Sequence, residues 1–181
     1  METASAKRRR AAEIAAVLAD WYPDATRSPL RWSTPLELLV ATILAAQSRD
    51  DTVNQVMPGL LARFPDAAAL AAAPIEELED RVRQTGFFRN KARLVQGCCR
   101  QLVERHGGEV PPRMADLTAL PGVGRKTANV VLTNCFGIPG IVVDTHVLRV
   151  SGRLGLTASS DPEVVEADVG ALLPESGWAA F

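Results

Sequence analysis

Helix signals recur along this sequence, whereas the alternating apolar and polar pattern of a β-strand is nearly absent. The clearest signal begins at Thr34, whose hydroxyl suits a helix cap, and continues with Pro35 at the first helical position. Glu37 stands where a capping box places its acidic partner. The apolar residues that follow share one helix face, which we expect in the core: Leu36, Leu39, Val40, Ile43 and Leu44. The predicted fold class is all-α.

The same rules predict further helices. Starts are expected near Asp51, Asp66, Pro74 and Asn90. The helix from Asn90 should stop at Gly107-Gly108 and should turn five apolar residues inward: Leu94, Val95, Cys98, Leu102 and Val103. A helix pair is expected over 114–120 and 125–136, and Asp144 and Asp161-Pro162 should open two more helices. Pro58 falls inside a helical run, which predicts a kink or a break there.

Composition limits the class of protein. The 181 residues, 47% of them hydrophobic, can bury one sizeable core or a core with a smaller lobe. A formal net charge of −1 argues against a surface that attracts nucleic acid everywhere, so any such contact must be local. The three cysteines suit neither a disulfide framework nor a metal site, which favours a reducing cytoplasm. The basic run 7–10 is interpreted as a solvated helix start, with phosphate contact as the alternative, rather than as an export signal, and no stretch is long enough to span a bilayer.

A glycine-rich turn joins the predicted helix pair. The segment Leu120-Pro-Gly-Val-Gly-Arg-Lys-Thr-Ala128 lets the backbone adopt angles that other residues avoid and leaves N–H groups free to face an anion. We expect this hairpin to hold a nucleic acid phosphate. The residues predicted to contact it are Leu120, Gly122, Val123, Gly124, Arg125 and Thr127.

Lys126 and Asp144 are the candidate catalytic residues. Lysine is a nucleophile only as the free amine, and the positive end of a helix together with Arg125 favours that form at Lys126. The alternative is an ordinary lysine that contacts a phosphate. Asp144 precedes Thr145-His146 as a helix cap, and a carboxylate held there could also stabilise positive charge and accept a proton. One helix and a short apolar connector separate the two residues, a spacing that allows their side chains to meet.

These residues resemble a known family. Ala119-Leu-Pro-Gly-Val-Gly-Arg-Lys-Thr-Ala128, followed by Val143-Asp-Thr-His146, is similar to the helix-hairpin-helix DNA glycosylase superfamily, specifically its endonuclease III branch. Further similar segments extend the resemblance over nearly the whole chain: Leu44-Ala-Ala-Gln47, Thr85-Gly-Phe-Phe88, Asn90-Lys91-Ala92 and Gly108-Glu-Val-Pro111. The resemblance implies a six-helix barrel lobe over 28–138, with the helix-hairpin-helix at about 114–136. A second helical lobe would join 1–27 to 139–181, with DNA in the cleft between the lobes.

The resemblance also implies a reaction. Lys126 would attack C1′ of a damaged nucleotide, expel an oxidised pyrimidine, and form a Schiff base that leads to strand cleavage by β-elimination. The partner would be double-stranded DNA with a damaged base or an abasic site, acted on by a monomer in the bacterial cytoplasm. Two alternatives remain open at this point: a monofunctional mismatch glycosylase that does not use the lysine, and a non-catalytic DNA-binding module.

Extrusion of a nucleotide leaves a gap in the duplex, and two residues are candidates to fill it. By resemblance Gln47 is the plug, and Phe87 stands where relatives often have a leucine wedge. The alternatives are a helix-end polar group for Gln47 and core burial for Phe87. His146 could contact the flipped base or a phosphate, or simply pack on its helix. Four basic residues are weaker candidates for phosphate contact: Arg49, Arg89, Lys91 and Arg149.

One family feature has no counterpart in these residues. Many members bind a [4Fe-4S] cluster through four cysteines near the C-terminus, and such clusters need that set of thiolates. Here the sequence ends at Trp178-Ala-Ala-Phe181 without them. We therefore expect no metal ligands in this chain, and either a partial chain or a cluster-free variant. A cluster is expected only if the protein continues past Phe181 with the four-cysteine loop.

Overall fold

The structure is a computed structural model that describes residues 2–23 and 28–180. Throughout those residues the regular elements are helices, with no strand, which confirms the all-α prediction. The chain forms two compact units. The central unit is Pro29–Phe136, and the terminal unit combines Met1–Ser28 with Gly137–Phe181.

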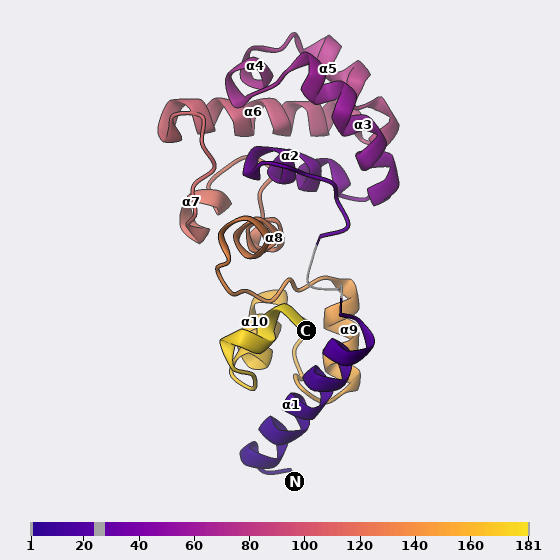
Figure 1. Cartoon of the computed structure of the whole chain (residues 1–181), viewed down its shortest axis with the longest axis vertical. Coiled ribbons are helices and arrows are strands. Elements are labelled where there is room, and N and C mark those ends of the chain that lie inside the picture. Colours follow the sequence, from indigo (N-terminus) through magenta and orange to yellow (C-terminus); the bar gives the residue numbers. More distant parts are fainter. Residues whose placement is uncertain (1, 24–27, 181) are drawn as a thin grey trace. The chain divides into compact units, whose positions relative to one another are not determined.

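The central unit is layered around helix α6 (Figure 1). Helices α4 and α5 contact α6 on one side, and α2 contacts it on the other; α2 also contacts α3 and α8, and α7 contacts α8. The helices of this unit are α2 (Pro35–Ala45), α3 (Asp50–Arg63), α4 (Ala67–Ala72), α5 (Ile75–Arg81), α6 (Phe88–His106), α7 (Met114–Thr118) and α8 (Arg125–Phe136), with a 3₁₀ turn η1 (Arg83–Thr85).

Helix α2 begins as the sequence predicts. The Thr34 hydroxyl accepts a hydrogen bond from the Glu37 N–H at 3.3 Å. The Glu37 carboxylate accepts from the N–H of Ser33 at 2.6 Å, one residue earlier than a standard capping box. Every residue from Leu38 to Leu44 except Thr42 is buried, so α2 is covered on more sides than the predicted stripe, while Leu36 is only half-buried.

Helix α6 follows the predicted stripe with one exception. Val95, Cys98 and Leu102 are fully buried, Leu94 is half-buried, and Gly107 ends the helix in the left-handed conformation with φ of 62°. Val103 is 40% exposed, so its predicted burial is wrong. The reason is geometric: each helical residue turns about 100°, which carries Val103 past the edge of the stripe that Leu102 still occupies.

Pro58 does not break its helix. Helix α3 continues through it to Arg63, so of the two predicted outcomes a break is excluded. A proline in a helix leaves one carbonyl without its N–H partner. Pro58 lies on the exposed side of α3, where water can hydrogen-bond to that carbonyl. The helix pair around the glycine turn is also observed, although α7 ends at Thr118 rather than Leu120.

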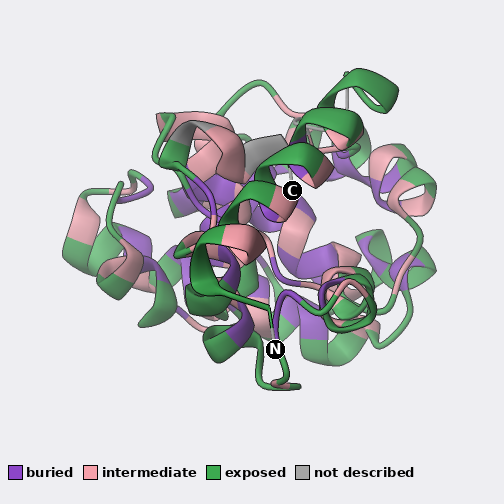
Figure 2. Ribbon diagram, turned by 90° about the horizontal axis from the view of Figure 1, so that it is seen from below, coloured by how far each residue is buried: buried purple, intermediate pink, exposed green. Residues whose placement is uncertain are grey.

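The terminal unit has its own small core. Its elements are α1 (Ala4–Trp21), α9 (Thr145–Arg153), α10 (Pro162–Gly170) and the 3₁₀ turn η2 (Glu175–Ala180). The buried apolar residues are Ala11, Ala15, Ile141, Val143, Leu156, Val165, Val169 and Leu173. Asp161 caps α10 as predicted. Figure 2 shows buried segments on the inner sides of the helices and exposed segments on their outer sides. None of the described helices is long and apolar enough to cross a membrane.

The basic run 7–10 lies within the first half of α1 rather than at its very start, which Thr3 caps. Arg10 is not simply solvated: its guanidinium forms an ion pair with Glu2 at 2.7 Å and donates to the carbonyl of Leu154. Arg8 and Arg9 are exposed, as expected for a solvated helix face.

Candidate active site

The glycine turn of the central unit packs against helix α6. Leu120 and Val123 are buried, and the Val123 N–H donates to the Leu120 carbonyl at 3.1 Å. Gly122 has φ of +76°, and a Cβ built there would lie 3.1 Å from Leu94 Cβ. Pro121 approaches Gly97 of α6, where an added Cβ would meet its ring at 3.5 Å. Both glycines therefore allow the close contact of the turn with α6.

Gly124 differs from Gly122. It is exposed, its φ is not in the left-handed range, and a Cβ built on it would meet nothing within 4 Å. Packing within the chain therefore does not require a glycine at this position. Its N–H donates to no atom of the described residues. The Gly124 N–H, just before the start of α8, is thus a donor that an anion could reach.

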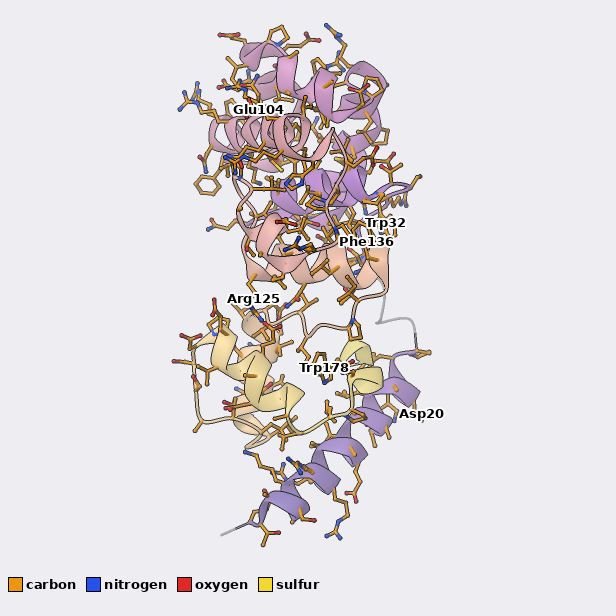
Figure 3. All side chains as sticks on the ribbon, turned by 90° about the vertical axis from the view of Figure 1, so that its left-hand side faces the viewer. Asp20, Trp32, Glu104, Arg125, Phe136 and Trp178 are labelled. Atoms are coloured by element: carbon orange, nitrogen blue, oxygen red, sulfur yellow. The ribbon has the colours of Figure 1, made fainter. Side chains whose placement is uncertain are left out.

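Lys126 lies on the solvent side of the first turn of α8. Its neighbours Ala128 and Asn129 are buried against the core, whereas Lys126 is exposed. Within the part of the chain that the structure describes, its ammonium group has neither an ion pair nor a hydrogen bond. Arg125, beside it, is also exposed, and Figure 3 shows Arg125 and Phe136 at the two ends of α8. Thr127 is half-buried.

The chain contains three lysines, which makes the position of Lys126 informative. Lys91 is 3% exposed, and its Nζ donates to two backbone carbonyls. Lys7 is half-buried on α1 of the terminal unit. Lys126 is the one lysine of the three whose side chain is exposed.

Asp144 belongs to the terminal unit and caps α9, as predicted. Its Oδ1 accepts hydrogen bonds from the N–H groups of His146 and Val147, both at 2.8 Å. Its other oxygen, Oδ2, receives no hydrogen bond from the residues described. The cap thus fixes the carboxylate while one oxygen is left for another partner. His146 is exposed, and its Nδ1 lies 3.0 Å from the Arg149 guanidinium, an arrangement in which the neutral ring carries its proton on Nε2.

Gln47 and Phe87 share an unusual backbone conformation. Among the described residues other than glycine, only these two have positive φ, 53° for Gln47 and 46° for Phe87. Such a conformation costs of order 1–3 kcal/mol and persists only where the surrounding structure enforces it. Phe87 is 70% exposed, so the alternative of core burial is wrong. Gln47 is exposed too, and its side chain bonds to no described backbone group, which removes the helix-end alternative.

Lys91 corrects one of the weaker predictions. It cannot contact a phosphate, because it is buried and its ammonium donates to the carbonyls of Leu44 at 2.7 Å and Thr85 at 2.6 Å. Burial lowers the pKa of this lysine. A signal was present in the sequence: Lys91 falls on the same helical stripe as Val95, Cys98 and Leu102, where a solvated lysine would not be expected. Arg49, Arg89 and Arg149 are exposed.

The three cysteines do not fit an iron–sulfur cluster. Cys98 and Cys99 are fully buried in α6, and burial raises the pKa of the Cys98 thiol to about 12 and that of Cys99 further. Cys135 lies on α8, with its pKa raised by burial to about 11. A cluster needs thiolates that converge, and no group of three or more potential metal ligands occurs among the described residues.

Comparisons with known proteins agree with this geometry. Residues 40–175 match the HhH-GPD superfamily of base excision DNA repair proteins. The chain is 53% identical over 178 residues to endonuclease III of Synechocystis sp., a match that covers 98% of this chain and 81% of that protein. A trapped covalent endonuclease III–DNA intermediate has a TM-score of 0.88 at 41% identity, and a non-covalent endonuclease III–DNA complex has 0.90 at 40%. Each of these matches covers 99% of this chain and 82% of the other. The chain belongs to the HhH-GPD superfamily and, within it, to the endonuclease III family.

Proposed function

We propose that Lys126 is the nucleophile of this base excision repair DNA glycosylase and that the enzyme is also an abasic-site lyase. The observation that carries this proposal is the exposed Lys126 amine, which has no partner among the described residues and lies two residues after Gly124. Lys91 is buried and bonded to two carbonyls, and Lys7 is half-buried far from any glycine turn in the sequence. The similarity to a trapped covalent endonuclease III–DNA intermediate supports a covalent step.

The proposed reaction begins with the free amine of Lys126. Its lone pair attacks C1′ of the damaged nucleotide, the bond from C1′ to the base breaks, and the base leaves with the electron pair and takes up a proton. The amine then loses a proton, the sugar ring opens, and a protonated Schiff base joins Nζ to C1′. Removal of a proton from C2′ breaks the C3′–O bond, which cleaves the strand on the 3′ side. Water then hydrolyses the Schiff base and releases Lys126.

Asp144 is proposed to assist Lys126. Its Oδ1 is held by two N–H groups of α9, and its Oδ2 is available to accept the proton that the amine loses or to stabilise positive charge on the sugar. Lys126 belongs to the central unit and Asp144 to the terminal unit. Their joint action is inferred from their chemistry and from the family.

DNA contact is proposed for the glycine turn and for the loops that contain Gln47 and Phe87. The N–H of Gly124 would hold a backbone phosphate, with Gly122 and the buried Leu120 and Val123 fixing the turn. Gln47 would fill the gap left by the flipped nucleotide, and the exposed ring of Phe87 would stack in the duplex as a wedge. His146 is proposed to contact the DNA beside Asp144, in view of its exposure.

The substrate is proposed to be double-stranded DNA with an oxidised pyrimidine or an abasic site, acted on by a monomer in the cytoplasm. We also propose that Pro29–Phe136 corresponds to the six-helix barrel lobe and that the terminal unit corresponds to the second lobe. A panel of duplexes, each with one lesion, would identify the preferred base by the rate of its release.

The lysine assignment is tested by borohydride trapping. Reduction of the Schiff base should link the wild-type protein to DNA that contains an abasic site, and Lys126→Ala should give no adduct. Lys7→Ala is the matched control, because it removes an amine from a helix surface of the other unit, and it should trap as the wild type does. Base release without strand cleavage or adduct would instead indicate a monofunctional glycosylase. DNA binding that persists without any turnover would indicate a non-catalytic module.

A further inference from the structure

Lys91 connects the two loops that contain Gln47 and Phe87, the non-glycine residues with positive φ. Leu44 is the second-last residue of α2, and the loop that follows carries Gln47. Thr85 ends η1, two residues before Phe87. The Lys91 Nζ donates to the carbonyls of both Leu44 and Thr85, at 2.7 and 2.6 Å. One nitrogen therefore joins two segments that are 41 residues apart in the chain.

A second contact ties Lys91 to the same region. The backbone N–H of Lys91 donates to the carbonyl of Phe87 at 3.1 Å, and the N–H of Asn90 donates to the same oxygen at 3.0 Å. Phe87 thus occupies the N-cap position of α6 in a left-handed conformation, without a side-chain cap. Lys91 holds the backbone on both sides of Gly86-Phe87, through Nζ before this pair and through its own N–H after it.

Burial makes the connection specific. Leu44, Thr85 and Lys91 are each less than 4% exposed, so water cannot replace the ammonium group at these carbonyls. The Leu44 carbonyl lies in the last turn of α2, where a helix provides no N–H partner. A buried carbonyl without a donor is unfavourable, and a lysine is rarely buried unless its donors are used. The buried Lys91 ammonium therefore supplies the donors that these two carbonyls need, and no solvent molecule can take its place.

We propose that Lys91 is a positioning residue that fixes the backbone of the Gln47 and Phe87 loops, so that both side chains are held ready to enter a DNA duplex. This inference rests on the proposed function, in which those two side chains occupy the gap and the step beside a flipped nucleotide. Lys91 itself does not touch DNA. It holds two residues in a conformation that they would otherwise leave, because their positive φ is unfavourable without support.

The inference is tested with two DNAs that differ only in pairing around an abasic site. One is a fully paired duplex, and the other places the same site in a short unpaired bubble, where no base must be displaced. Lys91→Met keeps the length of the side chain and removes its donors, and it should slow borohydride trapping on the paired duplex by roughly tenfold. On the bubble its rate should change by less than about twofold. Lys91→Arg, which keeps donors, should recover part of the loss.

A fluorescence measurement separates this inference from the catalytic proposal. In the Lys126→Ala background no chemistry is expected, and 2-aminopurine opposite the abasic site should brighten on binding as it is unstacked. Lys91→Met should remove most of that rise. If the wild type traps neither DNA, the role of Lys126 fails, while the fluorescence still decides the role of Lys91.

The control is Leu102→Ala, which removes a fully buried side chain from the same helix, away from both loops. It should lower the melting temperature and yet keep the wild-type ratio of the rates on the two DNAs. Lys91 would have a merely structural role if Lys91→Met slowed trapping equally on both DNAs or left the fluorescence rise unchanged. Either result would overturn the inference.

Discussion

Gly122 is the position at which the fold of the glycine turn can be tested most directly. Gly122→Ala is expected to destabilise the fold for two reasons. The backbone has φ of +76°, which costs an L-residue about 1–2 kcal/mol. The Cβ would also lie 3.1 Å from Leu94 Cβ and 3.5 Å from Ile43 Cγ2. Leu94 Cβ is attached directly to the backbone of α6, so a rotamer change cannot move it away.

The expected loss of stability in Gly122→Ala has three contributions. Overpacking of a core contact costs about 1–3 kcal/mol, which adds to the conformational cost. Alanine also restricts the unfolded chain more than glycine does, which offsets about 0.4–1 kcal/mol. We therefore expect Gly122→Ala to lower the free energy of unfolding by roughly 2–4 kcal/mol, or the melting temperature by roughly 5–15 °C. Urea unfolding followed by circular dichroism measures the first quantity directly.

Gly124→Ala is the matched control, because it makes the same substitution two residues later in open space. Alanine is a poorer helix cap than glycine, so a stability loss of about 0.5–1 kcal/mol is expected. Its binding of abasic DNA should fall by about tenfold, since the added methyl group obstructs an anion at the N–H and a charge-assisted hydrogen bond contributes about 1.5–3 kcal/mol. The reasoning is refuted if Gly122→Ala is as stable as the wild type, or if Gly124→Ala binds DNA normally.

Two further predictions concern charge. Asp144→Asn should retain the cap on α9 and the wild-type stability, because asparagine caps as well as aspartate, yet it should lose most glycosylase activity. Asp144→Ala should lose activity and also about 1 kcal/mol of stability; equal activity of Asp144→Asn and the wild type in a base-release assay would contradict the role of the charge. Burial raises the pKa of the Cys98 thiol from 9.0 to about 12, so above pH 9 the unfolded chain releases a proton that the folded chain retains. Stability should therefore fall between pH 9 and 12, by up to about 1.4 kcal/mol per pH unit for this thiol, and urea titrations should show a shallower fall in Cys98→Ala.

Local rules predicted the helix starts well. Thr34, Asp66, Asp144 and Asp161 were each identified as caps or starts from their side chains, and each accepts the expected backbone hydrogen bond. The cap is decided within three residues, so the sequence contains all the information that it needs. The left-handed end of α6 at Gly107 is local for the same reason.

Features that depend on distant neighbours were predicted less well. The position of Lys91 on the apolar stripe of α6 indicates burial, but its partners, the carbonyls of Leu44 and Thr85, are set by the tertiary fold and cannot be found from the local sequence. The exposure of Phe87 was equally open, because an aromatic residue beside apolar neighbours usually packs into a core. The roles of Lys126 and Asp144 stay predictions. They lie in different units, and neither residue's own neighbourhood specifies the other.

Helix α6 holds several parts of the candidate site at once: Lys91 secures the Gln47 and Phe87 loops, and Leu94 and Gly97 seat the glycine turn. Changes along this face should therefore be epistatic, with paired substitutions deviating from the sum of the single ones. Altering lesion preference without loss of turnover is more feasible at the loop tips than along this shared support. Directed evolution of the enzyme would be expected to leave the inner side of α6 almost untouched.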